Sequence, residues 1–150
     1  MEKDHKYFMR QALQQAQKAA DMGEVPVGCV VVHEGAVIGR GHNLRESRAD
    51  PTAHAEIEAL KQAAAELDTW YLEGTTVYCT LEPCCMCAGA LVNARVERLV
   101  YGLSDDKSGA CGSVVNLLQQ PALNHQVEII SGTLAEESLH LLQSFFKERR

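Results

Sequence analysis

Two short segments of the chain contain residue types that bind metals and move protons. The first contains His54 and Glu56, two positions apart, and the second contains Cys84 and Cys87, which follow Pro83. Thiolates and neutral imidazole are the ligands that Zn²⁺ prefers, at about 2.0–2.3 Å in a tetrahedral arrangement. Cys84 and Cys87 are three positions apart and therefore lie on one face of a helix. Because a helix N-terminus lowers the pKa of nearby thiols, we expect both cysteines to be available as thiolates.

His54 and Glu56 must reach the same site from the start of a helix. Residues two positions apart are separated by about 200° around a helix, so they cannot share a lateral face. Asp50 as a cap and Pro51 as the first helical residue predict a helix that continues to about Ala65. Side chains in a first turn lean toward the N-terminus. We therefore expect two helix N-termini to converge on one metal ion.

The number of ligands distinguishes a catalytic metal from a structural one. His54, Cys84 and Cys87 provide three ligands, whereas a closed structural zinc site uses four. Three protein ligands leave one position for water, whose pKa the metal lowers to about 7. Glu56, two residues from a ligand, is then placed to move protons rather than to bind the metal. This set of residues is suited to hydrolytic attack on an sp² carbon that bears an amino group.

The alternative for the cysteine pair is a redox pair or a structural zinc site in a non-catalytic module. A structural site would need a fourth ligand, and the nearby thiols are Cys79, Cys85 and Cys111. A free cysteine more often behaves as a small buried apolar residue, which we expect of these three and of Cys29. The His-x-Glu segment upstream of the cysteine pair favours catalysis.

The surrounding elements are predicted from apolar spacing and turn residues. Strands are predicted at residues 27–32, 36–42, 75–80, 98–103 and 127–130. Helices are predicted at residues 3–21, 51–65, 83–94, 114–119 and, after a capping box at 133–136, nearly to the end of the chain. Strands and helices alternate after an opening antiparallel hairpin, so the expected fold is an α/β sandwich of helices around a mixed sheet whose later strands are parallel. No repeat or long linker interrupts residues 1–150, so we expect a single domain.

Composition narrows the classes of protein further. The 150 residues are 46% apolar and 23% charged, close to the soluble globular average, which excludes a disordered chain. No apolar run approaches the roughly 20 residues that span a bilayer, and no signal peptide is present at the N-terminus. We therefore expect a cytoplasmic protein with no membrane partner, in which cysteines serve a metal or catalytic role rather than disulfides. A net charge of −6 argues against broad, non-specific nucleic-acid binding but leaves room for a local basic patch.

H-x-E followed by P-C-x-x-C is the signature of zinc-dependent nucleobase deaminases. Beyond the signature, the chain resembles the bacterial tRNA adenosine deaminase family over nearly its whole length. The matching stretches are residues 24–28, 41–43, 50–56, 80–84, 86–90, 107–110 and 145–147. Cys85, where the family usually has an apolar residue, and Leu103, where it has a small one, depart from the pattern.

This resemblance implies a fold, a reaction and a partner. The implied fold is a cytidine-deaminase-like three-layer sandwich, with a mixed five-stranded sheet and helices on both faces. The implied reaction is zinc-dependent hydrolytic deamination of adenosine to inosine at the wobble position of a tRNA anticodon stem-loop, by a homodimer. A deaminase of a free base or nucleoside, such as guanine or cytosine, with the same zinc centre is the alternative.

The resemblance also implies a role for each site residue. One Zn²⁺ per chain would be held by His54, Cys84 and Cys87, with Glu56 as the catalytic proton shuttle. Substrate contacts would come from Asn43, the backbone of Ala55, and Asp105 in the loop around the nucleotide.

The sequence does not determine which cationic side chains bind RNA phosphates. The tail combines aromatic residues with cations and either contacts RNA or packs on the core; it comprises Phe145, Phe146, Lys147, Arg149 and Arg150. The other candidates are Arg40, Arg45, Arg48, Arg95, Arg98 and Lys107.

Overall fold

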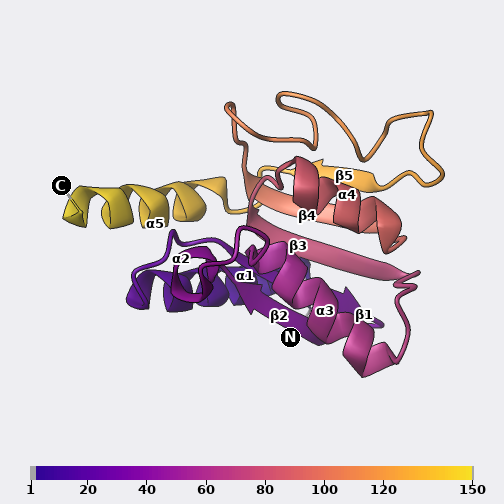
Figure 1. The fold of residues 1–150 in the computed structure, drawn as a ribbon, viewed down its shortest axis with the longest axis horizontal. Helices are drawn as coiled ribbons and strands as arrows, with labels where there is room; N and C mark the ends of the chain where they lie inside the picture. The colour runs from indigo at the N-terminus through magenta and orange to yellow at the C-terminus, as the bar shows by residue number, and fades with distance from the viewer. Residues whose placement is uncertain (1–2, 150) are drawn as a thin grey trace.

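The computed structural model describes residues 3–149 and contains one mixed sheet with the strand order β2-β1-β3-β4-β5 (Figure 1). The strands are β1 (Gly28–His33), β2 (Ala36–His42), β3 (Thr75–Leu81), β4 (Arg98–Leu103) and β5 (Glu128–Ser131). The helices are α1 (His5–Asp21), α2 (Arg45–Arg48), α3 (Ala55–Leu67), α4 (Cys85–Asn93) and α5 (Ala135–Glu148). β1 is antiparallel to both β2 and β3, whereas the β3–β4 and β4–β5 pairs are parallel. The expected mixed sheet of five strands is confirmed.

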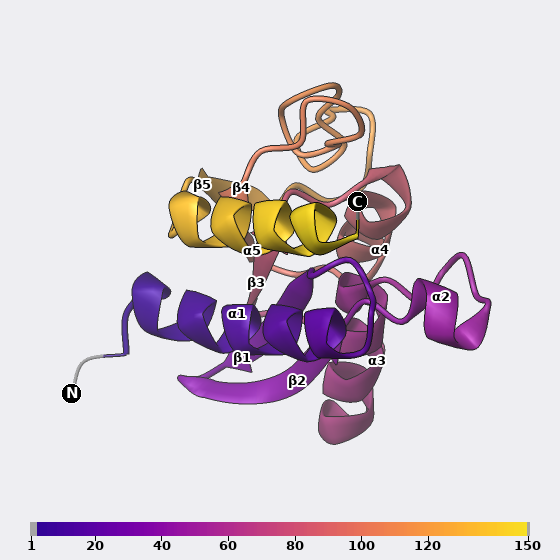
Figure 2. The same ribbon diagram turned by 90° about the vertical axis from the view of Figure 1, so that its left-hand side faces the viewer.

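Helices cover both faces of the sheet. α1 and α5 lie side by side on one face, as Figure 2 shows, and α3 and α4 pack on the other. The alternation of buried residues along the central strands produces this arrangement: Val30 and Tyr78 face α1, and Val31 and Val77 face α3 and α4. Since both faces are covered, β1 is apolar along nearly its whole length.

Glycines on β2 bring α3 into direct contact with the sheet. A Cβ atom at Gly39 would lie 2.3 Å from the carbonyl oxygen of Ala59, and one at Gly41 would lie 2.3 Å from that of Ala55. No side chain fits at either position. The first turn of α3, which carries the proposed site residues, is therefore seated on β2 through backbone contact.

α3 begins four residues later than the sequence predicts. Asp50 does not cap the helix; its Oδ1 accepts hydrogen bonds from the N–H and the hydroxyl of Thr52, at 2.8 and 2.7 Å. This local turn competes with helix formation. The helix starts at Ala55, with His54 as its N-cap residue.

Two further predictions about the elements are wrong, and one short helix was missed. Residues 114–119 form no helix, because the N–H of Val114 bonds to the carbonyl of Gly109 and that of Leu117 to Ala110. The capping box at 133–136 is absent: Leu134 caps α5 in the left-handed conformation, with φ 53° and no side-chain bond. The four-residue helix α2 was not predicted. None of the helices in the described range 3–149 is long and apolar enough to cross a bilayer.

Candidate active site

The N-termini of α3 and α4 meet, and three side chains from them form a cluster. His54 is the N-cap residue of α3, and Cys84 is the N-cap residue of α4. Nδ1 of His54 lies 3.7 Å from Sγ of Cys84 and 3.5 Å from Sγ of Cys87. The three donor atoms all lie within 4.8 Å of one another. The structure thus brings together the residues that the two sequence segments supply.

The spacing of these donor atoms fits a metal ion. A tetrahedral zinc with bond lengths of about 2.0–2.3 Å separates its nitrogen and sulfur ligands by about 3.5–3.6 Å. The two observed nitrogen–sulfur distances are close to this value. One imidazole and two thiols also match the ligand types that zinc prefers. Within residues 3–149 the cluster consists of these three side chains only.

The remaining cysteines do not complete a four-ligand structural site. Cys79 and Cys29 are buried, and their sulfur atoms lie 3.3 Å apart on neighbouring strands. Cys111 is also buried, and its thiol is directed at the carbonyl of Pro83 at 3.9 Å. The expectation that Cys85 packs in the interior is wrong: it is exposed in the first turn of α4. The structural-zinc alternative therefore lacks its fourth ligand in the described chain.

The two clustered thiols differ in acidity. A hydrogen bond from Cys87 lowers the pKa of Cys84 to about 5, although burial opposes the shift. The same interaction with Cys84, together with burial, raises the pKa of Cys87. A metal ion bound by both sulfur atoms would displace any thiol proton, because metal ligands must be deprotonated.

Glu56 is the buried carboxyl group beside this cluster. It lies in the first turn of α3 and is 4% exposed. Burial raises the pKa of Glu56, while the nearby His54 lowers it. A carboxyl group with a raised pKa is suited to accept and return a proton near neutral pH.

The cluster opens into a cavity of about 180 Å³. Pockets for drug-sized ligands have about 300–1,000 Å³, so this one admits a group no larger than a single base. The side chains in its wall come from five parts of the chain: Val25, Val27, Asn43, Arg45, His54, Ala55, Glu56, Leu81, Glu82, Cys84 and Ser108. His54, Cys84 and the buried Glu56 therefore line one small chamber.

Two of the three proposed substrate contacts lie in this wall. Asn43 is held by a hydrogen bond from its amide to the carbonyl of Val25 at 3.3 Å and by one from the N–H of Arg45 to its Oδ1 at 3.0 Å. Ala55 also lines the cavity. Asp105 does not; its carboxylate accepts bonds from its own loop, and Ser108 of that loop lines the cavity instead.

Sequence reasoning missed two buried carboxylates in the site, Glu24 and Glu82. Glu24 accepts hydrogen bonds from the N–H groups of Glu46 at 3.1 Å and Ser47 at 2.6 Å, and so fastens the segment that carries Asn43. The available signal for Glu24 was an acidic residue close to a buried strand. The residues that donate to Glu24 lie more than twenty positions away in sequence, so spacing alone could not reveal them.

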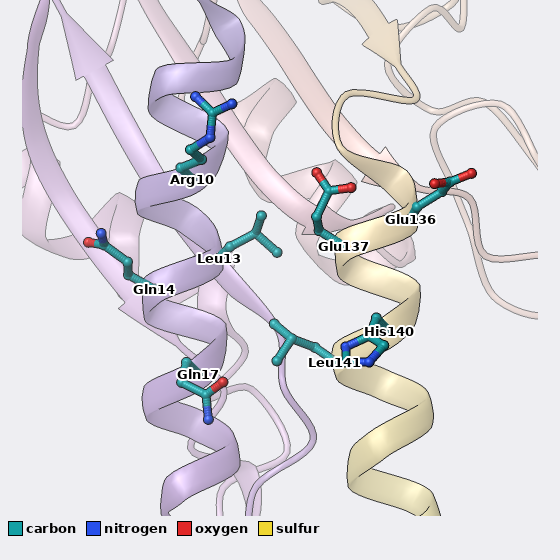
Figure 3. A pocket seen from close by; sticks show the side chains of 8 residues that line it. All are labelled: Arg10, Leu13, Gln14, Gln17, Glu136, Glu137, His140 and Leu141. Atoms are coloured by element: carbon teal, nitrogen blue, oxygen red, sulfur yellow. The ribbon is translucent and has the colours of Figure 1, made fainter.

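A larger groove between α1 and α5 lacks such chemistry. Its volume is about 730 Å³, and Figure 3 shows Leu13 and Leu141 pointing toward each other from the two helices. Arg10, Glu137 and His140 lie along it without forming a metal cluster. The smaller cavity is therefore the candidate active site.

Comparison with known proteins identifies the family. The model of the MafB19-like deaminase family matches residues 3–150. The chain is 50% identical over 143 residues to the tRNA-specific adenosine deaminase of Bacillus subtilis, covering 95% of this chain and 89% of that protein. The chain belongs to the tRNA-specific adenosine deaminase family.

Other tRNA-specific adenosine deaminases show the same extent of similarity. The Aquifex aeolicus enzyme is 48% identical, covering 96% of this chain and 95% of that protein. A solved structure from a study of A-to-I editing by tRNA:A34 deaminases at the wobble position superposes with a TM-score of 0.87 and 43% identity, covering 91% of this chain and 99% of that one. The expected cytidine-deaminase-like fold of this deaminase family is confirmed.

Proposed function

We propose that the chain deaminates adenosine to inosine at the wobble position of a tRNA anticodon, with one zinc ion per chain. The observation that carries the proposal is the convergence of His54, Cys84 and Cys87 beside the buried Glu56 in a chamber sized for one base. The names of the relatives, which are tRNA-specific adenosine deaminases, support the substrate. Because tRNA is used for translation in the cytoplasm, we place the enzyme there.

The metal ligands and Glu56 divide the chemistry between them. Nδ1 of His54 and the sulfur atoms of Cys84 and Cys87 would hold the zinc ion, which would supply the Lewis acidity that makes water a nucleophile at neutral pH. The carboxylate of Glu56 accepts a proton from the attacking water. It passes this proton to N1 of the adenine ring. It then takes the second proton from the hydroxyl group on C6 and passes it to the amino group, which leaves as ammonia. Water and adenosine are consumed, and inosine and ammonia are released.

The walls of the chamber orient the base. We assign Asn43 and the backbone of Ala55 to contacts with the adenine, and the loop of Asp105 to contacts with the nucleotide. The amide of Asn43 is fixed by its bonds to Val25 and Arg45, so it needs little reordering when the base enters. A wobble base already lies in a single-stranded loop, and extruding it costs little.

The cations nearest the chamber are the best candidates to bind phosphates. Arg45 lines the chamber, and Lys107 precedes Ser108 in its wall. Arg98 is engaged elsewhere, since its Nε lies 2.9 Å from Glu128. Arg95 donates to the carbonyl of Val92 at 2.9 Å. We therefore assign the first phosphate contacts to Arg45 and Lys107.

The tail is divided between packing and exposure. Phe145 is buried, and the guanidinium of Arg149 lies 4.3 Å from the centre of its ring. Phe146 is exposed and Lys147 is free to meet solvent. Arg150 lies outside the described residues. Phe145 thus packs on the core, and a contact with RNA would come from Phe146 and Lys147.

An apolar surface beside the site supports the proposed homodimer. Trp70 is 65% exposed and adjoins a hollow of about 340 Å³ between α3 and α4 that includes Ile57 and Ala90. Exposed apolar patches on soluble proteins commonly mark protein interfaces. We propose that two copies of the chain meet through this face, which predicts twice the chain mass in solution.

The direct test uses an RNA stem-loop with adenosine at the wobble position. The zinc-loaded protein is expected to convert that adenosine to inosine, detected by mass spectrometry of the digested RNA. Removal of zinc with a chelator should abolish the reaction, and added zinc should restore it. Absence of inosine with zinc-loaded, folded protein would contradict the proposal.

A free base or nucleoside remains the second candidate substrate. The chamber of about 180 Å³ would hold guanine or cytosine as well as an extruded adenine. The volume therefore does not separate the two candidates, and only a comparison of substrates does.

A further inference from the structure

Glu82 is a buried carboxylate whose partners all come from one loop. Its side chain is 3% exposed, and it takes part in none of the ion pairs formed within residues 3–149. Oε1 accepts hydrogen bonds from the N–H of Asp105 at 3.0 Å and from the hydroxyl of Ser113. Oε2 accepts from the N–H groups of Cys111 at 3.0 Å and Ser113 at 3.1 Å. Four donors thus replace water around a charge that would otherwise be costly to bury.

These bonds fix both ends of the loop that forms one wall of the chamber. The loop comprises residues 104–113, at the start of the long connection between β4 and β5 (Figure 1). Between its two ends, Asp105 accepts bonds from the N–H groups of Lys107 at 3.0 Å and Ser108 at 3.2 Å. Ser108 then lines the chamber. Glu82 holds the two ends, and the turn at Asp105 positions the part between them.

The loop and the carboxylate are matched in shape. A Cβ atom at Gly109 would lie 2.4 Å from Cδ of Glu82 and 2.5 Å from the carbonyl oxygen of Asp105. Both distances are far below van der Waals contact. Only glycine lets the loop close over the carboxylate.

Glu82 also connects this loop to the metal cluster. Its N–H donates to the carbonyl of Leu103 at 2.9 Å, which joins the ends of β3 and β4. Two residues later the chain reaches Cys84, the N-cap residue of α4. One residue therefore links the N-terminus of α4, where Cys84 lies, to the loop that contributes Ser108 to the chamber wall.

We propose that Glu82 is a positioning residue that holds the loop 104–113 in the shape that receives the nucleotide. It acts through Ser108 and Asp105 rather than on the reacting atoms. The inference rests on the proposed function for its substrate, but the state of the loop can be measured without any substrate.

The test begins with Glu82→Gln. The glutamine amide has the same shape, but its NH₂ group would face N–H donors of the loop. At least one hydrogen bond between residue 82 and the loop is therefore lost. Amide hydrogen exchange of residues 104–113 is expected to accelerate, while zinc content stays unchanged. On the anticodon stem-loop, KM is expected to rise about tenfold and kcat to stay within about threefold, since a binding wall is loosened and the reacting groups are not.

Thr75→Val is the matched control for general destabilisation. Thr75 is fully buried at the far end of β3, and its hydroxyl donates to the carbonyl of Leu72 at 2.6 Å. Loss of this hydrogen bond in Thr75→Val should lower the melting temperature without changing KM or the amide hydrogen exchange of residues 104–113. A Glu82→Gln protein that matches this control in both measurements would overturn the proposal.

Two milder variants keep the test decisive if Glu82→Gln does not fold. Ser113→Ala removes one donor from the carboxylate, and Gly109→Ala pushes a methyl group against it. Both should accelerate exchange in the loop and raise KM in the same direction as Glu82→Gln. Unchanged exchange in both would refute the role of Glu82.

A wild-type protein that fails to deaminate the stem-loop would instead refute the proposed function. The exchange data would still decide whether the hydrogen bonds of Glu82 hold the loop.

Discussion

Two buried carboxyl groups, Glu56 and Glu82, line the chamber, and a third, Glu24, holds the segment that follows Asn43. Glu24 and Glu82 both accept hydrogen bonds from backbone N–H groups and so hold segments that contribute to the chamber wall. Glu56 differs, because burial raises its pKa by more than the nearby hydrogen bonds and the charge of His54 lower it, whereas the pKa of Glu24 is lowered overall. A side chain held by fixed donors positions the structure around it, whereas a carboxyl group with a raised pKa can exchange a proton near neutral pH. We therefore assign proton transfer to Glu56 alone.

The first prediction concerns Glu56→Gln. The amide keeps the size of the side chain but cannot accept and return a proton, so kcat should fall by about 10²–10⁴. Zinc content, measured by atomic absorption, should be unchanged, because the proposed ligands His54, Cys84 and Cys87 remain. Near-normal turnover in the zinc-loaded variant would show that the proton passes through another group.

The second prediction separates a metal ligand from its neighbour in sequence. Cys87→Ser should bind zinc at a reduced stoichiometry and melt at a lower temperature, since metal binding is coupled to folding. Each kcal/mol lost lowers Tm by about 2–4 °C in a chain of this size. Cys85→Ser, which alters an exposed thiol on the same helix, is the control and should retain both properties. Full zinc occupancy and an unchanged Tm in Cys87→Ser would remove that residue from the ligand set.

At the scale of elements, the sequence predicts the regular structure well and the irregular structure poorly. The strands at residues 36–42 and 98–103 have the predicted bounds, because β-branched and apolar runs between turn residues depend only on local sequence. The helix predicted at 114–119 fails because Leu118 is buried as part of a loop, where its apolar character reflects tertiary packing.

The candidate site divides in the same way. His54, Cys84 and Cys87 could be predicted because ligand type and spacing are local properties, and the helix N-termini then bring them together. The contribution of Glu82 could not, since its donors lie more than twenty positions away in sequence. The hydrogen bonds that the Asp105 carboxylate accepts within its own loop could not be predicted either, because they depend on the backbone geometry of the loop.

The third prediction concerns the segment that Glu24 fastens to the chamber. Burial raises the pKa of Glu24, but hydrogen bonds from Ser47 and the N–H of Glu46, with the charge of Arg45, outweigh it and hold the pKa below the ordinary 4.5. A carboxyl group whose pKa is lower in the folded state stabilises the fold above its unfolded pKa. That contribution is lost as pH falls through the folded pKa.

The free energy of unfolding, measured in urea between pH 7 and pH 3, should therefore decline less steeply below about pH 4.5 in Glu24→Gln than in the wild type. At pH 7 the variant should be less stable by about 1–3 kcal/mol, because buried N–H donors lose their partner. Glu66→Gln, an exposed substitution on α3, is the control and should follow the wild-type curve. Parallel curves for Glu24→Gln and the wild type would refute this assignment.

At the scale of the whole molecule, an acidic protein must bind a polyanion. The net charge is −6, so affinity for RNA has to come from a few cations near the chamber rather than from the overall field. Arg45 in the chamber wall and Lys107 in the loop 104–113 meet this requirement. The pairing of Arg98 with Glu128 removes that residue from the candidates.

The fourth prediction follows from this arrangement. Arg45→Ala and Lys107→Ala should each raise KM for the stem-loop. Each should also reduce the slope of log KM against log salt by about 0.7, the value for one contact with a single-stranded phosphate. Arg98→Ala, which removes a cation of the same type already paired with a carboxylate, should leave the slope unchanged. An equal loss of slope in Arg98→Ala would indicate that the field of the whole protein, and not these two contacts, binds the RNA.

The most direct test of the central claim is a comparison of kcat/KM across substrates with the same zinc-loaded preparation. The substrates are the anticodon stem-loop with a wobble adenosine, free adenosine, guanine and cytosine. If the chain is a tRNA deaminase, the stem-loop reacts at least about a hundredfold more efficiently than any free base or nucleoside, because phosphate contacts contribute to binding. Comparable kcat/KM on free adenosine, guanine or cytosine would contradict the claim and establish the small-molecule alternative.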